Sequence, residues 1–230
     1  MTNSRTERAE STKQAIVTAA EALFAEHGIG AVSHRQIATA SRQGNNAAVA
    51  YHFGTKADLV AAIHLRHAGV IEQRMERSLA RMADSTELAD WIDAMVRGLT
   101  DHLAALGTPS WYARFCAQAM ADPVYADVLN HTAMAGPALN RVVAGMNRCL
   151  PELPQYIVAE RHAMTRLLLN HTCADYEAGF AEGREMPRAD WESVTAGLVD
   201  AMVGLWCAPH TVRHPPAPGR SGPPIERTSS

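Results

Sequence analysis

Three motifs of the capping-box type lie within the first 60 residues and constrain the fold more than any other feature of the chain. They are Ser-Thr-Lys-Gln at 11–14, Ser-His-Arg-Gln at 33–36 and Thr-Lys-Ala-Asp at 55–58. In such a box the first side chain caps a helix N-terminus, and the fourth side chain reaches back to the N–H of the capping residue. The boxes therefore predict helices that begin near residues 12, 34 and 56.

The spacing of apolar residues completes this N-terminal pattern. It predicts helices over about 12–27, 34–40 and 46–51, a tight turn at 41–44, and a long helix over 56–82. Two short helices joined by a tight turn form a helix-turn-helix, whose second helix enters the major groove of DNA. A helical hairpin inside an all-α enzyme would show the same pattern, so the pattern alone leaves both readings open.

The rest of the chain is helical by the same criteria, and no strand-like alternation occurs. Further helices are expected over about 86–106, 109–121, 122–149 with a break at 136–137, 155–183 and 190–207. The expected fold class is all-α, with an N-terminal three-helix helix-turn-helix domain and a larger C-terminal helical domain for ligand binding and dimerisation. The expected division of the chain is a flexible arm at 1–10, the helix-turn-helix domain at 11–55, the helical domain at 56–208 and a disordered tail at 209–230, which is rich in Pro, Gly and Ser.

Charge is distributed unevenly along the chain. Residues 1–66 contain seven Lys or Arg and five Asp or Glu, which gives +2, whereas the whole chain carries −3 and the remainder −5. A weakly basic front on an acidic body suits a protein that touches phosphates with one end only. No apolar stretch is long enough for a membrane span and the N-terminus is polar, so a cytoplasmic location is expected.

Signals for an enzyme or a metal site are weak. The four cysteines show no CxxC pair, so we expect small buried apolar residues rather than a disulfide frame or a zinc site: Cys116, Cys149, Cys173 and Cys207. His64 and His67 are three residues apart on a helix, but no further ligands converge on them in the pattern. With no nucleophile elbow, phosphate loop or nucleotide fingerprint, neither catalysis nor a cofactor or metal is expected. A helical interaction protein without DNA binding is a third class.

The string Tyr-His-Phe-Gly-Thr-Lys at 51–56, preceded by the helix-turn-helix, resembles the DNA-binding domain of the TetR (tetracycline repressor) family. The resemblance spans residues 11–60, about a quarter of the chain, and includes Ile16, Ala19, Ala20, Leu23, Phe24, Gly28, Ser33, Arg35, Ile37, Ala38 and Leu59. It is closest to the branch with two asparagines in the turn, Asn45 and Asn46, and that turn is one residue longer than in the commoner pattern. The resemblance implies a regulator, expected to be a repressor, that binds palindromic DNA as a homodimer and is released by a small molecule.

DNA contacts are expected on both sides of the turn. Ser33 could offer its hydroxyl and its backbone N–H to a phosphate, and Lys56 adds a cation at a helix start. By resemblance, Tyr51 and His52 meet the DNA backbone. The candidates for base contact and close helix approach precede or begin the second helix: Arg42, Gln43, Asn45, Asn46 and Ala47. Asn45 could instead serve only as a cap, Phe53 is expected in the core, and the cations Arg5, Arg8 and Lys13 form either a minor-groove arm or a solvated tail.

The last two long helices are expected to form the dimer interface, because their apolar residues cover more than one side. The candidates are Leu168, Trp191, Val194, Leu198, Met202, Leu205 and Trp206, and burial inside one subunit is the alternative. Large adaptable side chains, with polar residues among them, suggest a pocket for an apolar or amphipathic effector. Its candidates are Trp91, Met95, Trp111, Arg114, Phe115, Gln118, His131, Asn170 and His171, and a plain core explains the apolar ones equally well.

Overall fold

The computed structural model describes residues 2–42, 47–82 and 85–210, with only the backbone path for residues 2–5. Within these residues the chain forms ten α-helices and no strand, and the helices account for 81% of them. The all-α fold class predicted from the sequence is therefore confirmed. Within the same described segments, none of these helices is long and apolar enough to cross a membrane.

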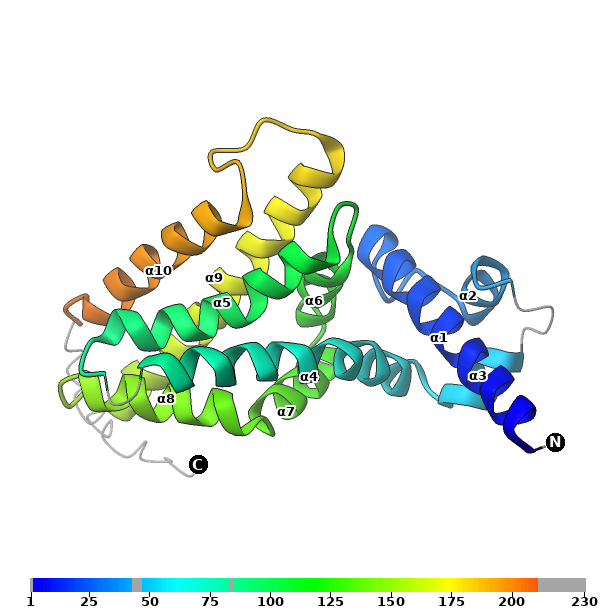
Figure 1. Ribbon diagram of the computed structural model, residues 1–230, viewed down its shortest axis with the longest axis horizontal. Coiled ribbons are helices and arrows are strands. Elements are labelled where there is room, and N and C mark those ends of the chain that lie inside the picture. Colours follow the sequence, from blue (N-terminus) through cyan, green and yellow to red (C-terminus); the bar gives the residue numbers. More distant parts are fainter. Residues whose placement is uncertain (1, 43–46, 83–84, 211–230) are drawn as a thin grey trace, which may run out of the picture.

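The N-terminal helices form a separate unit, which we call the head (Figure 1). It comprises α1 (Thr2–His27), α2 (His34–Ala40) and α3 (Ala47–Phe53) together with the start of α4 (Lys56–Met82). Apolar side chains from each of these helices are completely or almost completely buried: Ile16, Ala20 and Phe24 of α1, Ile37 and Ala38 of α2, Val49 of α3, and Leu59 and Ile63 of α4. This burial supplies the main stabilising free energy of the unit.

Helix α1 is longer than the sequence pattern predicted. It begins at Thr2, so residues 2–10, expected to be a flexible arm, continue the helix, and the motif at 11–14 lies in its interior. Gln14 donates to the Glu10 carboxylate at 3.1 Å, one turn earlier, instead of reaching back to a cap at Ser11. The physical reason is composition, because this stretch consists mostly of good helix formers and contains no Gly or Pro.

The other two capping boxes form as predicted. Ser33 Oγ accepts from the Gln36 N–H at 3.3 Å, and Gln36 Oε1 accepts from the Ser33 N–H at 2.8 Å. Asp58 accepts from the Thr55 N–H at 3.0 Å while its own N–H donates to Thr55 Oγ1 at 3.1 Å. Both helices consequently begin at the predicted residue.

The remaining helices form a larger unit, which we call the body, together with the rest of α4. They are α5 (Leu88–Leu106), α6 (Tyr112–Met120), α7 (Pro123–Met134), α8 (Pro137–Cys149), α9 (Gln155–Glu182) and α10 (Trp191–Cys207). Asp122 caps α7 ahead of Pro123, and Gly183 ends α9 with a φ of +66°. The predicted breaks at 136–137 and 151–154 separate helices as expected.

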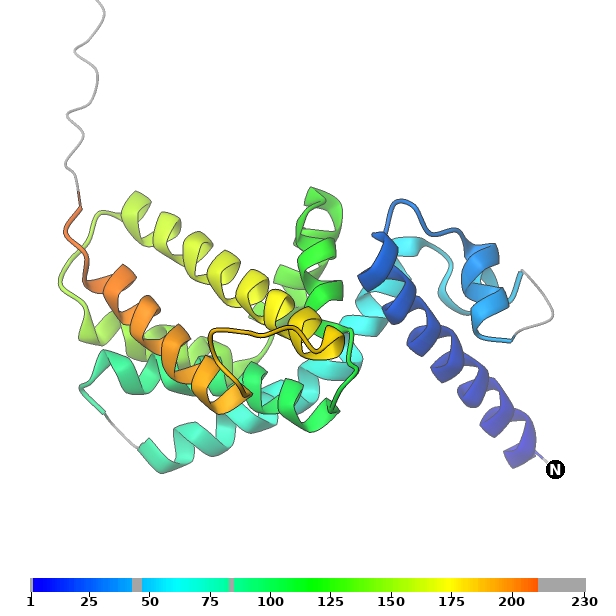
Figure 2. The ribbon, with the colours of Figure 1, turned by 90° about the horizontal axis from the view of Figure 1, so that it is seen from above.

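Helix α5 is the centre of the body. It packs against α4, α8 and α10, while α6 stands between α9 and the head helix α1 (Figures 1 and 2). Figure 2 shows the head set apart from most of the body, with α1 pointing away from it. The head therefore meets the body through α4 and through the α1–α6 contact.

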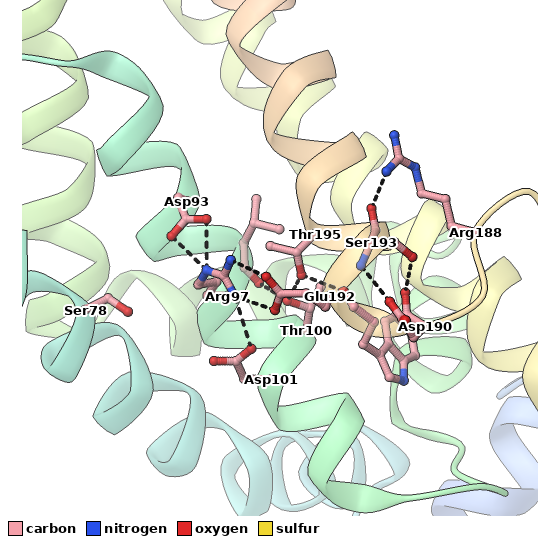
Figure 3. Close-up of polar contacts among 12 residues, drawn as sticks. Ser78, Asp93, Arg97, Thr100, Asp101, Arg188, Asp190, Glu192, Ser193 and Thr195 are labelled. Carbon is pink, nitrogen blue, oxygen red and sulfur yellow. Dashed lines mark hydrogen bonds and ion pairs between the residues drawn. The ribbon is translucent and has the colours of Figure 1, made fainter.

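Polar contacts fix α10 on α5 (Figure 3). The Arg97 guanidinium donates to both carboxylate oxygens of Glu192 at 2.8 Å and to Asp93 at 3.0 Å. Beneath this ion pair the buried hydroxyls of Thr100 and Thr195 lie 2.7 Å apart. A bidentate pair combined with a buried hydrogen bond sets the rotation of α10 about its axis.

Candidate nucleic-acid interface

The outer side of the helix-turn-helix is exposed, as a DNA-reading surface requires. Val49 of α3 is 1% exposed and turns into the head, whereas Tyr51, two residues later, is 85% exposed. Ala47 and Ala50 of α3 are exposed on the same helix. A short helix with small exposed residues can approach base edges closely, because no bulky side chain holds it away from the groove.

The turn before α3 begins with a residue in an uncommon conformation. Arg42 has a φ of +56°, in the left-handed region, and its N–H donates to the Thr39 carbonyl at 3.1 Å. This backbone follows the end of α2 and leaves the Arg42 side chain exposed. The predicted contacts Gln43, Asn45 and Asn46 lie outside the described residues.

Two aromatic residues follow at the end of α3. The rings of Tyr51 and His52 meet edge to face with centroids 5.1 Å apart, and His52 is half-buried while Tyr51 is open to solvent. Phe53 is half-buried and packs on the core, in line with its predicted core role. Tyr51 and His52 thus lie beside each other at the end of α3, and their contact with the DNA backbone stays a prediction.

Ser33 was predicted to offer two donors to a phosphate, and both are engaged within the head. Its hydroxyl donates to Gln36 Oε1 at 2.8 Å, and its backbone N–H donates to the same oxygen at 2.8 Å. In this conformation Ser33 acts as a helix cap with both donors engaged, and its phosphate contact stays a prediction. Arg35, two residues later, is exposed in the first turn of α2 and is an additional candidate; its position within the first helical turn was the signal for it.

Lys56 has a structural partner that the sequence did not indicate. Its Nζ donates to the Ile29 carbonyl at 2.9 Å and so ties the loop after α1 to the start of α4. An ammonium group has three donors, of which this carbonyl uses one. Phosphate binding by Lys56 stays a prediction, whereas its hydrogen bond to Ile29 stabilises the packing of the head.

The basic residues near the N-terminus lie on a helix rather than on a flexible arm. Arg8 and Lys13 are exposed on α1, whose N-terminal end projects freely at the outer side of the head (Figure 2). The side chain of Arg5 is outside the described part. Any DNA contact from this segment would be made by a preformed helix.

The predicted dimer residues divide into two groups. Four of the seven are buried in the chain's own core with 0–3% exposure, namely Val194, Leu198, Met202 and Trp206. They face α5 and α9, and the indole of Trp206 donates to Thr165 Oγ1 at 2.9 Å. These four residues are therefore buried inside one subunit, which was the alternative reading. The other three, Leu168, Trp191 and Leu205, are half-buried. The apolar side chains that α9 exposes instead are Tyr156, Met164 and Leu167.

The predicted effector residues do not converge on one cavity. Trp91 and Phe115 are 4% and 0% exposed and belong to the core, and Arg114 is held by Glu177 and by the Ser110 carbonyl. The other six are spread over the body. Met95 and Trp111 are half-buried on α5 and at the start of α6, and Asn170 is half-buried on α9. Gln118, His131 and His171 are exposed on α6, α7 and α9. These positions correct the expectation of a single pocket lined by all nine.

Two surface depressions can be described. One of about 570 Å³ lies along α1 and includes Arg66 and Trp111, the latter from the predicted set. Another of about 420 Å³ lies between the end of α9 and the start of α10 and includes Phe180, Arg184 and Trp191.

Metal-ligand geometry is not found in the residues that the structure describes, where no group of three His, Cys, Asp or Glu is placed to hold an ion. All four cysteines are free thiols. Cys116 and Cys173 are buried as expected, Cys149 is half-buried, and Cys207 is exposed, because it is the last residue of α10.

Residues 16–63 match the family of bacterial regulatory proteins described as the tetR family. This segment begins within α1 and ends within α4, so it covers the head apart from the first half of α1. A search of curated proteins finds no match.

Solved structures with similar architecture come from several bacteria. The regulator PfmR of the TetR family from Thermus thermophilus is 19% identical, with a TM-score of 0.50, over 81% of this chain and 96% of its own. A TetR-family regulator from Streptomyces coelicolor is 18% identical with a TM-score of 0.45, over 86% and 96% of the two chains. A protein from Mesorhizobium loti that is described as a TetR-family regulator is 16% identical with a TM-score of 0.46, over 86% and 98% of the two chains. The match to PfmR shows a common fold.

Proposed function

We propose that the chain is a TetR-family repressor that binds a palindromic operator as a homodimer and leaves the DNA when a small molecule binds its body. The match of residues 16–63 to the tetR family of bacterial regulatory proteins supports this proposal. The observation on which this proposal chiefly rests is the exposed helix-turn-helix surface, where Arg42 and the 85%-exposed Tyr51 flank a recognition helix of small outward residues. Such a surface has no evident use in a monomeric helical enzyme, whereas it fits the major groove of DNA.

The proposed roles of the surface residues follow from their positions. Arg42 contacts a base or phosphate at the start of α3, Tyr51 and His52 contact the backbone at its end, and Arg35 contacts the backbone from α2. Gln43, Asn45 and Asn46 remain candidates for base contact. A single head covers only a few base pairs, and two heads on a twofold axis would recognise a palindrome.

For the dimer we propose the outward faces of α9 and α10. Support comes from Met164 and Leu167, which are 43% and 45% exposed on α9, and from the small exposed residues Ala201 and Gly204 on α10. Exposed apolar side chains next to small residues allow two helices of a second copy to pack closely. Leu168 and Leu205, half-buried in one chain, would complete this surface.

The proposed effector is apolar or amphipathic, as the sequence suggested. Half-buried large side chains such as Met95 and Trp111 are the support for it, since Met side chains adapt to a ligand. The effector must bind the DNA-free arrangement of the heads more tightly than the DNA-bound one, and DNA must weaken effector binding by the same factor.

A mobility-shift titration with DNA from upstream of the gene tests the DNA-binding part. We expect Arg42→Ala and Tyr51→Ala to weaken binding several-fold to about a hundredfold, as loss of one good contact does. Arg77→Ala, which removes an exposed arginine from the far half of α4, is the matched control and should bind as the wild type does. Binding that ignores both sequence and salt would refute the proposal, because phosphate contacts make affinity fall with salt.

Light scattering after size exclusion tests the dimer. Leu167→Glu places a charge on the exposed face of α9 and should yield monomers, whereas Val124→Glu on the exposed face of α7 should not. Unchanged dimers in Leu167→Glu would place the interface elsewhere.

A further inference from the structure

A chain of buried ionisable side chains joins the head to the body. His67 Nε2 of α4 lies 3.0 Å from Glu21 Oε2 of α1, and His67 Nδ1 lies 2.8 Å from His102 Nε2 of α5. Next to them His64 Nδ1 of α4 lies 3.0 Å from the Tyr112 hydroxyl of α6. All five residues are at most 8% exposed, although buried groups of this type are uncommon unless paired. The DNA-binding surface described above does not explain them.

The rings are also packed against one another. Tyr112 stacks on His67 with centroids 3.9 Å apart, and the centroids of His67 and His102 are 5.0 Å apart. Members of this cluster therefore come from four helices, two of which, α1 and α4, carry the head. A change in the hydrogen bonds of this cluster would alter the packing between the head and the body.

Proton accounting defines how many states this chain of hydrogen bonds allows. A carboxylate only accepts, so His67 donates to Glu21 from Nε2. With both imidazoles neutral, His102 donates to His67 Nδ1; with one added proton, His67 donates to His102, and the bond persists. With two added protons both facing nitrogens carry hydrogen, so the bond is lost and two cations stand 2.8 Å apart.

The charged and titratable surroundings make the second proton costly. Arg66 Nη1 lies 3.7 Å from Glu21 Oε2, and burial lowers the pKa of His102 to about 4, with added repulsion from His67 and Arg74. Burial, with repulsion from His67, likewise lowers the pKa of His64 to about 4. Tyr112 and Cys116 of α6 stay neutral, because burial raises the pKa of both groups, and Glu177 of α9 further raises that of Cys116. Hence His67 and Arg74 add repulsion to the cost of a second proton, and Glu21, the carboxylate next to His67, also lies close to Arg66.

We propose that Glu21, His67 and His102 form a proton-operated link between head and body, which holds α1 against α4 and α5 when it carries at most one added proton and opens when it takes up a second. Opening loosens the head and lowers DNA affinity, so the regulator releases DNA in acid as well as with its effector. This inference rests on the proposed function. The ligand that regulates DNA affinity here is the proton, which binds to the link.

The test is a pH titration of DNA affinity at fixed ionic strength. We expect the wild type to lose affinity about tenfold or more between pH 7.5 and pH 5, while His102→Gln, whose amide donates to His67 but takes no proton, loses less than about threefold. His162→Gln is the matched control, because burial also lowers the pKa of His162, which lies against Trp206 far from the cluster. It should follow the wild type. Glu21→Gln is a second variant of the link, which keeps an acceptor for His67 but removes the negative charge of the carboxylate.

Hydrogen exchange of α1 at each pH gives a readout that needs no DNA. Corrected for the intrinsic rate, exchange over 16–27 should rise in acid in the wild type and not in His102→Gln, with far-UV circular dichroism showing folded protein throughout. If no variant binds DNA at pH 7.5, the proposed function fails, and the exchange data still decide whether the link opens. Equal pH profiles of wild type and His102→Gln in both measurements would overturn the inference.

Discussion

The buried histidines predict how the stability of the fold depends on pH. Burial lowers the pKa of His64 and of His102 to about 4 in the folded chain, whereas an unfolded histidine has a pKa of about 6.5. The unfolded chain therefore takes up protons first, and stability is lost as the pH falls from about 6.5 towards 4. At neutral pH the two groups carry no such penalty.

The size of the loss follows from these values. At pH 5 each group favours the unfolded state by about 2 kcal/mol, so the pair removes on the order of 4 kcal/mol. A domain of this kind has a total stability of roughly 5–15 kcal/mol, so acid should remove a large share of it. Below pH 4 the loss levels off, since both states are then protonated.

Urea denaturation followed by circular dichroism at pH 7.5, 6 and 5 measures this loss. We expect His64→Gln to lower stability at pH 7.5 but to show only about half of the wild-type loss on going to pH 5. His27→Gln, an exposed position on α1, should show the full loss. A wild-type free energy of unfolding that is the same at pH 7.5 and pH 5 would refute the reasoning.

Three further predictions concern single positions. A Cβ on Gly145 would clash with the Trp91 ring, so Gly145→Ala should lower the stability of the fold by about 1–3 kcal/mol or more through overpacking. Calorimetry measures this loss, and an unchanged melting temperature would contradict the close approach of α8 to α5. Arg42→Gly should raise stability by about 1 kcal/mol, because glycine adopts a positive φ without strain. The same variant should bind DNA more weakly than the wild type, and an equal DNA affinity of the two would show that Arg42 does not contact DNA. Ser33→Ala should cost about 1 kcal/mol by loss of the cap, and comparison of its urea midpoint with that of Ser11→Ala, which lies inside α1, gives the reference.

Helix boundaries were predictable wherever the determining signal is local. Ser33, Thr55, Asp122 and Asp190 lie at helix starts, because each side chain binds backbone or side-chain groups within three residues of it. The same local pattern at 11–14 misled, since a capping box and a stretch of good helix formers can share one sequence. Only the residues before it, which continue the helix, decide between the two.

Which side of a helix faces the chain's own core was not predictable from periodicity. Helix α10 is apolar on several sides, and the structure turns Val194, Leu198 and Met202 inward towards α5. The contact between Arg97 and Glu192, 95 residues apart, selects this rotation, and no local pattern reveals it. The same is true of His64 and His67, which the pattern raised only as weak metal ligands and whose partners lie 35–48 residues away.

Helix α4 shows how an event in the body can reach the DNA-binding surface. It is one uninterrupted helix of 27 residues, about 40 Å long. Near its start Lys56 holds the loop after α1, and near its end Glu72 accepts the Ala138 N–H of α8 while Glu76 pairs with Arg141 at 2.7 Å. A shift of α8 would therefore displace the C-terminal half of α4, and the N-terminal end of the same rigid helix is bonded to the head. Under the proposed function, an effector would not need to bind close to the DNA surface to move it, and a binding position next to α8 would act as directly as one beside α1.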